Sequence, residues 1–142
     1  MQQPLSLSIP NRLQSLATAS AWLLQSLPGL GVGEPWLGRF DLCASEALSN
    51  IMGHGYADAA EHAIDLSLQR IGSEVCLQIR DDGIAFDPLQ HRQPPVPTCI
   101  EDAPIGGLSI AIILRIMTRC EYQRDPQGNC LRMFARIPKL GC

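Results

Sequence analysis

Three polar residues that could do chemistry stand four residues apart near position 50. Glu46, Asn50 and His54 follow the spacing i, i+4, i+8, which stacks their side chains in one column on successive turns of a helix. A carboxylate, an amide and an imidazole would then line one edge of that helix, at the boundary of its buried face. Taken alone, however, this column is more typical of the solvated edge of an amphipathic helix.

A second candidate is Asp81, which is followed two residues later by Gly83. Asp81 continues the alternation of the apolar residues in segment 75–79, so its side chain should point to the same buried face. A carboxylate buried there is costly unless something donates hydrogen bonds to it, and the amino group of a bound purine would be such a donor. The alternative is an Asp-Gly turn in which the carboxylate caps backbone amides, and the sequence leaves both interpretations open.

A third candidate is the pair Gly106 and Gly107, directly before Leu108 and Ser109 at the start of an apolar segment. Glycines at the beginning of a helix leave free N–H groups and the positive end of the helix dipole facing one point, which suits a polyphosphate. A Gly-Gly pair is weak evidence by itself, because it also occurs in any loop that ends in a helix. The chain contains neither a P-loop motif nor a G-x-G-x-x-G motif.

The surrounding elements should place these three groups around one sheet. Hydrophobic periodicity predicts strands at 5–9, 64–69, 75–80, 119–124 and 131–137, and helices at 13–27, 35–52 and 108–118. We expect Asn11 to cap the first helix and the last helix, apolar nearly all round, to be buried. Grouped strands and grouped helices favour an α+β fold in which helices pack on one face of a mostly antiparallel sheet.

Residues 81–107 lack periodicity and contain five of the chain's prolines. A loop of this length inside a compact domain is uncommon and often acts as a lid over a site. Arg92 is the only lysine or arginine within it, and it could contact phosphates or remain in solvent.

Composition excludes several classes of protein. The chain has 142 residues, is 46% hydrophobic and 18% charged, and carries a net charge of −3, so we expect one domain over residues 1–142 and no direct nucleic-acid partner. No apolar run is long enough to cross a bilayer, which favours a cytoplasmic protein without a membrane partner. The six cysteines show neither C-x-x-C pairs nor zinc spacing, and we expect them to be reduced thiols.

Taken together in this order, the motifs resemble those of the Bergerat ATP-binding fold of the GHKL superfamily. Within it, segments 45–50 and 50–56 resemble the first ATP motif of the anti-sigma factor serine kinases, and segment 82–88 resembles their second. Segments 106–110 and 117–122 resemble the third motif and the strand after it. The resemblance spans nearly the whole chain and implies a two-layer sandwich, with a mostly antiparallel mixed sheet and a flexible ATP lid.

The resemblance also implies a role for each candidate residue. Glu46 would be the general base, and Asn50 would bind the Mg²⁺ that bridges the phosphates of ATP. Asp81 would receive the adenine amino group, with Gly83 beneath the base. The backbone around the phosphates would come from Gly106, Gly107 and Leu108. His54 is interpreted as a family signature with a structural role at the helix end.

Two positions depart from the family pattern. Ala85 and Ser109 stand where the family usually has glycines, and each adds a side chain where the backbone should approach the nucleotide. The expected effect is on nucleotide affinity rather than on the fold, which leaves a weak or inactive kinase as an alternative.

The family resemblance implies partners as well. The acceptor would be a serine on a STAS-domain anti-anti-sigma protein, and the free kinase, usually a homodimer, would sequester a sigma factor. A second hypothesis is a nucleotide-binding module that captures a regulator without phosphorylating it. A third, the catalytic part of a histidine kinase, is disfavoured because no phosphoacceptor helix hairpin precedes the motifs.

Overall fold

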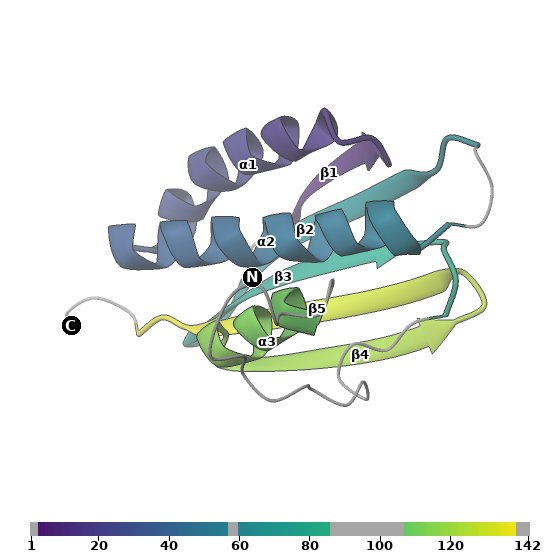
Figure 1. Ribbon diagram of the computed structural model, residues 1–142. Helices are drawn as coiled ribbons and strands as arrows, with labels where there is room; N and C mark the ends of the chain where they lie inside the picture. Colours follow the sequence, from purple (N-terminus) through teal and green to yellow (C-terminus); the bar gives the residue numbers. More distant parts are fainter. Residues whose placement is uncertain (1–2, 57–59, 86–106, 139–142) are drawn as a thin grey trace.

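The computed structural model describes residues 3–56, 60–85 and 107–138, which form two layers (Figure 1). The strands are β1 (Leu5–Pro10), β2 (Ala63–Ile71), β3 (Glu74–Asp81), β4 (Arg119–Asp125) and β5 (Gly128–Arg136). The helices are α1 (Ser15–Ser26), the 3-10 helix η1 (Leu27–Leu30), α2 (Glu34–His54) and α3 (Gly107–Ile116). The strands form a five-stranded sheet in the order β1-β2-β3-β5-β4.

The helices α1, α2 and α3 cover the same face of that sheet (Figure 1). Each neighbouring pair of strands, β1–β2, β2–β3, β3–β5 and β4–β5, is antiparallel. The expected α+β sandwich, with helices on one face of a mostly antiparallel sheet, is therefore confirmed. Most of the predicted lid at 81–107, namely residues 86–106 with Arg92, lies outside the described residues. Of its two ends, Asp81 belongs to β3 and Gly107 to α3.

The two hairpins follow from turn residues in the sequence. The β2–β3 turn contains Gly72 at φ +62°, a left-handed conformation that glycine adopts without strain. In the β4–β5 turn, Asp125 Oδ1 accepts a hydrogen bond of 2.8 Å from the N–H of Gln127. Gly128 follows at φ +138°, and a Cβ there would lie 2.0 Å from the carbonyl oxygen of Asp81. The turn therefore requires glycine at position 128.

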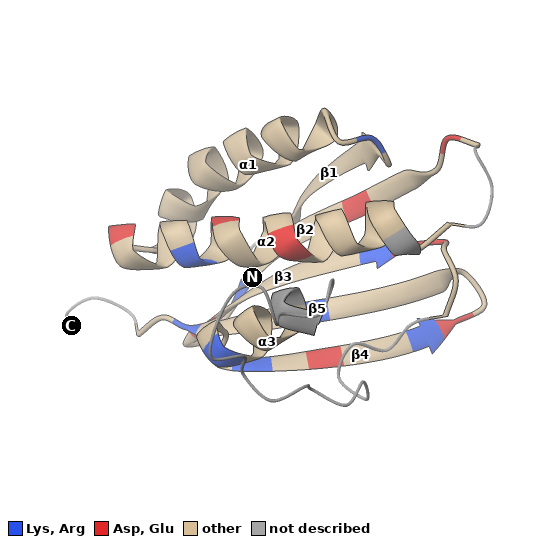
Figure 2. Ribbon diagram, in the orientation of Figure 1, with Lys and Arg blue, Asp and Glu red and all other residues tan. Residues whose placement is uncertain are grey.

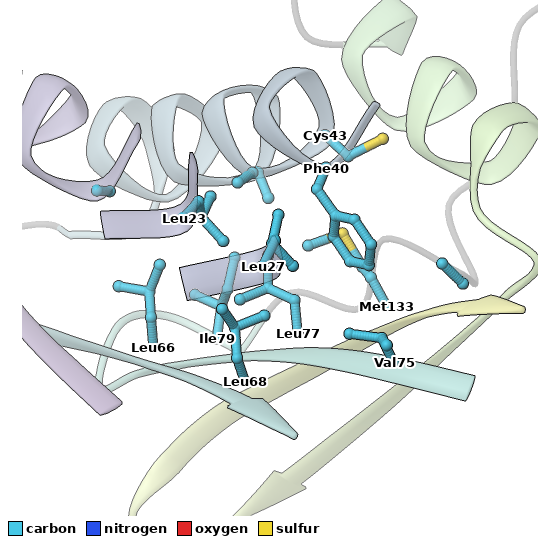
Figure 3. Packing of buried hydrophobic residues seen from close by; sticks show 14 of the residues in the cluster. Leu23, Leu27, Phe40, Cys43, Leu66, Leu68, Val75, Leu77, Ile79 and Met133 are labelled. Atoms are coloured by element: carbon cyan, nitrogen blue, oxygen red, sulfur yellow. The ribbon is translucent and has the colours of Figure 1, made fainter. Parts of the chain in front are cut away.

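The core lies between the sheet and α2. In β2, β3 and β5, the residues that face the helices are mostly buried, as the parity of their apolar residues predicts. On the opposite face, Cys76, Cys130 and Phe134 are buried as well. Phe40 of α2 is fully buried among them, with Leu23 of α1 and Leu27 of η1 nearby (Figure 3). Trp22 and Trp36 are partly buried and pack against this cluster.

The beginning of α1 differs from the prediction that Asn11 caps the helix. The N-cap position is Gln14, and it makes no side-chain capping hydrogen bond. Asn11 instead joins β1 to β2: its N–H donates to the His62 carbonyl at 2.9 Å, and its Oδ1 accepts from the His62 N–H at 2.9 Å. The last paired residues of these strands are Pro10 and Ala63, so the amide of Asn11 satisfies the backbone just beyond that pair.

The prediction of a fully buried last helix is wrong for one side of α3. Ile110 and Ile113 are buried, whereas Leu114 and Arg115 are exposed. The reason is the two-layer architecture of the described residues, in which α3 packs on α2 and the sheet and no other described element lies above it. Apolar periodicity alone does not reveal how many layers a fold has.

The described residues include four of the six cysteines. Cys43, Cys76, Cys120 and Cys130 are free, which agrees with the expectation of reduced thiols. Burial raises the pKa of Cys43 to about 12 and the pKa of Cys76 to about 11. Within the described ranges, no helix is both long and apolar enough to cross a membrane.

Candidate functional site

Helix α2 presents the first group of candidate residues. Its apolar stripe, which includes Phe40, Ala44 and Ala47, is buried against the sheet. Asn50 lies at the edge of that stripe and lines a cavity. Glu46 lies one turn earlier and is partly buried, but it is not among the residues that line the cavity.

The cavity lies between α2, α3 and the ends of β3, β4 and β5. Its apolar walls include Ile51 of α2 and Ile110 and Ile113 of α3. Its polar side chains are Asn50, Asp81, Tyr122 and Asn129. A mostly apolar cavity with a few convergent polar groups is the usual form of a small-molecule site. The fold therefore brings Asn50 and Asp81, 31 residues apart in sequence, to the same cavity.

Asp81 is only 8% exposed at the end of β3. Its Oδ1 accepts hydrogen bonds from the N–H of Gly83 at 2.9 Å and from Nδ2 of Asn129 at 3.0 Å. The two interpretations of the sequence are thus not exclusive, because the carboxylate caps its own turn and also faces the cavity. Among the described residues both bonds go to Oδ1, which leaves Oδ2 available to a ligand.

Gly83 is required by the approach of the turn to the end of α2. A Cβ at Gly83 would lie 2.2 Å from the carbonyl oxygen of Gly55, the residue at the C-terminal cap of α2. The same oxygen accepts a hydrogen bond of 2.7 Å from the N–H of Ile84. On the other side, Nη1 of Arg124 donates to the Gly83 carbonyl at 2.7 Å. The turn after β3 is therefore held by both α2 and β4.

A small aromatic cluster borders this turn. The rings of Tyr56 and His62 stack with centroids 4.3 Å apart, and Nδ1 of His62 lies 3.1 Å from Oδ1 of Asp82. The hydroxyl of Tyr56 is buried without a hydrogen-bond partner among the described residues. Burial, and then the charges of Asp81 and Asp82, raise the pKa of Tyr56 well above its usual value. Tyr56 is therefore neutral at physiological pH.

Tyr122 and Asn129 are cavity residues that the motif analysis missed. Asn129 is 7% exposed and lies directly opposite Asp81 in the pairing of β3 with β5. A signal for it was present in the sequence, since Asn129 continues the alternation of the buried residues Met133 and Ala135, as Asp81 does in β3. When the inward-facing apolar series of two neighbouring strands each end in a polar residue, both strands are expected to reach a binding site at that point.

The predicted phosphate-binding segment lies at the start of α3. Gly107 is the first residue of that helix, and Leu108 and Ser109 belong to its first turn. Ile110, the next residue, lines the cavity, so this helix end lies beside it. Gly106 falls outside the described residues, and Ala85 is exposed at the end of a described range. His54 is the last residue of α2.

Comparison with known proteins identifies the family. Residues 9–135 match the model of the histidine kinase-like ATPase domain. The chain belongs to this family. A serine/threonine-protein kinase, BtrW, from Bordetella bronchiseptica is 34% identical over 125 residues, which cover 85% of this chain and 88% of the relative. The anti-sigma F factor of Bacillus subtilis is 25% identical over 96 residues, or 67% of this chain and 66% of the relative.

A solved structure shows the same fold. The crystal structure of the RsbU and RsbW domains of Rv1364c from Mycobacterium tuberculosis aligns with 95% of this chain at a TM-score of 0.65 and 15% sequence identity. This chain spans 32% of that longer chain. The resemblance to the anti-sigma factor kinases of the GHKL superfamily is confirmed by the family match and by these relatives. A domain of the kinase-like ATPase family implies the use of ATP.

Proposed function

We propose that this chain is a single-domain, ATP-dependent serine kinase and anti-sigma factor of a bacterial partner-switching pathway. The observation that carries the proposal is the cavity shared by Asn50 and Asp81, which come from separate motifs. The BtrW relative, a named serine/threonine-protein kinase, supports the reaction class.

The adenine base would enter the cavity between α2 and α3. Oδ2 of Asp81 would accept a hydrogen bond from its exocyclic amino group, because Oδ1 already has two donors. The apolar side chains Ile110 and Ile113 would contact the ring. Gly83 would keep the turn close to the base, and Ala85 would follow at its edge.

Asn50 would hold Mg²⁺ through its side-chain oxygen. The described residues contain no group of three or more His, Cys, Asp or Glu side chains that could hold a metal ion. The amide oxygen of Asn50, which lines the cavity, is a hard oxygen ligand and fits Mg²⁺, an ion that takes few protein ligands and is otherwise held by phosphate oxygens and water. When bound, the ion would neutralise phosphate charge.

The transfer itself would depend on positioning and on one base. Glu46, one helical turn from Asn50, would accept the proton of the attacking serine hydroxyl. The backbone N–H groups at the start of α3, in Gly107, Leu108 and Ser109, would face the phosphates with the positive end of the helix dipole, and Gly106 would precede them. Positioning and charge stabilisation account for most of the rate in this class of reaction.

The proposed partners are a STAS-domain anti-anti-sigma protein, which would be phosphorylated on serine, and a sigma factor, which the free protein would sequester as a homodimer. The anti-sigma F factor of Bacillus subtilis supports the second partner by its name.

A second candidate function is a nucleotide-binding module that captures a regulator without phosphorylating it. The observations that favour it are the side chains of Ala85 and Ser109, where the family usually has glycine, and the position of Glu46 outside the cavity lining.

The deciding experiment is a phosphorylation assay with Mg-ATP and a STAS-domain anti-anti-sigma protein. We expect phosphoserine on the STAS protein, detected by mass spectrometry, and its loss with Glu46→Ala. The matched control is Glu34→Ala, which removes an exposed carboxylate from the same helix and should leave the rate unchanged.

The possible results separate the two functions. No phosphate on the STAS protein from the unmodified chain would exclude the kinase, and ATP binding that persists in that case would support the binding module. Equal rates for the unmodified chain and Glu46→Ala would overturn the assignment of Glu46 as the base.

A further inference from the structure

The inward faces of β3 and β5 end in a polar pair. Asp81 and Asn129 lie directly opposite each other in the antiparallel register and are 8% and 7% exposed. Two polar side chains buried at this depth are tolerated only when their donors and acceptors are paired.

The pairing runs through three strands. Nδ2 of Asn129 donates to Oδ1 of Asp81 at 3.0 Å and to the carbonyl oxygen of Ile84 at 2.8 Å. Oδ1 of Asn129 accepts a hydrogen bond from the hydroxyl of Tyr122 on β4. The chain of contacts therefore links β4, β5 and the turn after β3.

These neighbours determine the orientation of the Asn129 amide. Asp81 Oδ1 and the Ile84 carbonyl are both acceptors, so only the NH₂ group of the amide can satisfy them. The amide oxygen must then face Tyr122, whose hydroxyl supplies a donor. The reverse orientation would place an oxygen against a carboxylate and a carbonyl.

The fixed amide in turn determines which carboxylate oxygen meets the ligand. Because Asn129 and the N–H of Gly83 both occupy Oδ1 of Asp81, rotation of the carboxylate would break two hydrogen bonds to a charged group. Oδ2 is thus held in place as a pure acceptor toward the cavity that Asp81, Tyr122 and Asn129 share.

We infer that Asn129 and Tyr122 are positioning residues that give the site its preference for a 6-aminopurine over a 6-oxopurine. The inference rests on the proposed nucleotide site and adds its specificity determinant. A fixed Oδ2 acceptor favours the amino group of adenine and opposes the carbonyl group of hypoxanthine. Without the amide, the carboxylate can turn, and both the affinity and the discrimination fall.

The test measures the dissociation constants of Mg-ATP and Mg-ITP by calorimetry for the unmodified chain, Asn129→Leu and Tyr122→Phe. Loss of one hydrogen bond to a charged group corresponds to about a tenfold to hundredfold weaker affinity. We therefore expect Asn129→Leu to weaken ATP binding at least about tenfold and ITP binding much less. The dissociation constant of Mg-ITP divided by that of Mg-ATP should therefore fall toward one. Tyr122→Phe should lower this ratio by a smaller factor.

The control is Gln123→Leu, which removes an exposed amide from β4 and should leave both constants unchanged. If Asn129 had a purely structural role, Asn129→Leu would weaken the binding of ATP and of ITP by the same factor. That result would overturn the inference but not the proposed nucleotide site. If Asn129→Leu fails to fold, the same comparison of ATP and ITP affinities is made with Tyr122→Phe, which keeps the ring and its packing. An unmodified chain that binds neither nucleotide would overturn the proposed function as well.

Discussion

The two ends of the inward face of β3 and β5 differ sharply in chemistry. At one end, Val75 faces Ala135 and Leu77 faces Met133, and all four side chains are fully buried in the apolar core beneath Phe40 (Figure 3). At the other end, on the same face of the same strands, Asp81 faces Asn129 beside a cavity.

The comparison shows how one sheet face serves both stability and function. Burial of the apolar end stabilises the fold in proportion to the area removed from water. The polar end is nearly as buried, but its stability depends on a complete set of hydrogen bonds from Asn129 and the turn. Apart from Asp81, the charged residues avoid this face of β3 and β5: they alternate in sign along β4 and are absent from α1 (Figure 2).

The largest expected effect comes from the apolar end. Phe40→Ala should lower the free energy of unfolding by about 3–5 kcal/mol, because it leaves a cavity in a core where Phe40 is fully buried. Urea denaturation followed by circular dichroism measures this change. Leu13→Ala, at a side chain that is 69% exposed, should change stability by less than about 0.5 kcal/mol. Similar losses in both variants would contradict the assignment of the core.

The next largest effect separates binding from folding at the polar end. Asn50→Ala should abolish Mg²⁺-dependent nucleotide binding, with a loss of affinity of about a hundredfold or more, about 2.7 kcal/mol. The stability should change little, because Asn50 is only partly buried. Calorimetric titration with and without Mg²⁺ tests this, and Ser49→Ala at the exposed neighbouring position is the control. Unchanged ATP affinity in Asn50→Ala would refute the metal assignment.

A glycine pair tests the contact between the turn and α2. Gly83→Ala should destabilise the protein by about 1–3 kcal/mol, because the new Cβ would lie 2.2 Å from the Gly55 carbonyl oxygen. Gly38→Ala lies inside α2 with no atom within 4 Å of the added Cβ, so it should raise stability by about 0.5–1 kcal/mol. Thermal unfolding shows whether each variant is more or less stable than the unmodified chain. Stabilisation by Gly83→Ala would contradict the contact.

The smallest effect concerns alkaline pH at the buried thiol of α2. Burial raises the pKa of Cys43 from 9.0 to about 12. Between these pH values the thiol keeps its proton in the folded state but loses it in the unfolded chain. This contribution to stability is complete below pH 9 and is lost as the pH rises toward 12. The free energy of unfolding of Cys43→Ala should therefore fall less steeply above pH 9 than that of the unmodified chain. Ser45→Ala serves as a control whose pH curve should run parallel to that of the unmodified chain, and a parallel curve for Cys43→Ala would disprove the effect.

The sequence alone determined most of the elements and the order of the motifs. Alternation identified β2 and most of β3, because a half-buried strand turns every second residue to the core, and the series Leu131, Met133, Ala135 identified one face of β5. The spacing of Glu46 and Asn50 placed them on one edge of α2, because a helix repeats every 3.6 residues. The same parity argument indicated that Asp81 points inward. These features depend on local periodicity, which sequence records directly.

The tertiary structure decided the features that depend on neighbours distant in sequence. The pairing of β3 with β5 placed Asn129 against Asp81, although 48 residues separate them. Asn11 makes hydrogen bonds to the backbone of His62 rather than to a helix end, because β1 pairs with β2. One side of α3 is exposed because the described residues form only two layers. Gly83 is required by the carbonyl of Gly55 rather than by local turn geometry alone. Each of these outcomes is set by which segments meet in space, a quantity that no local pattern contains.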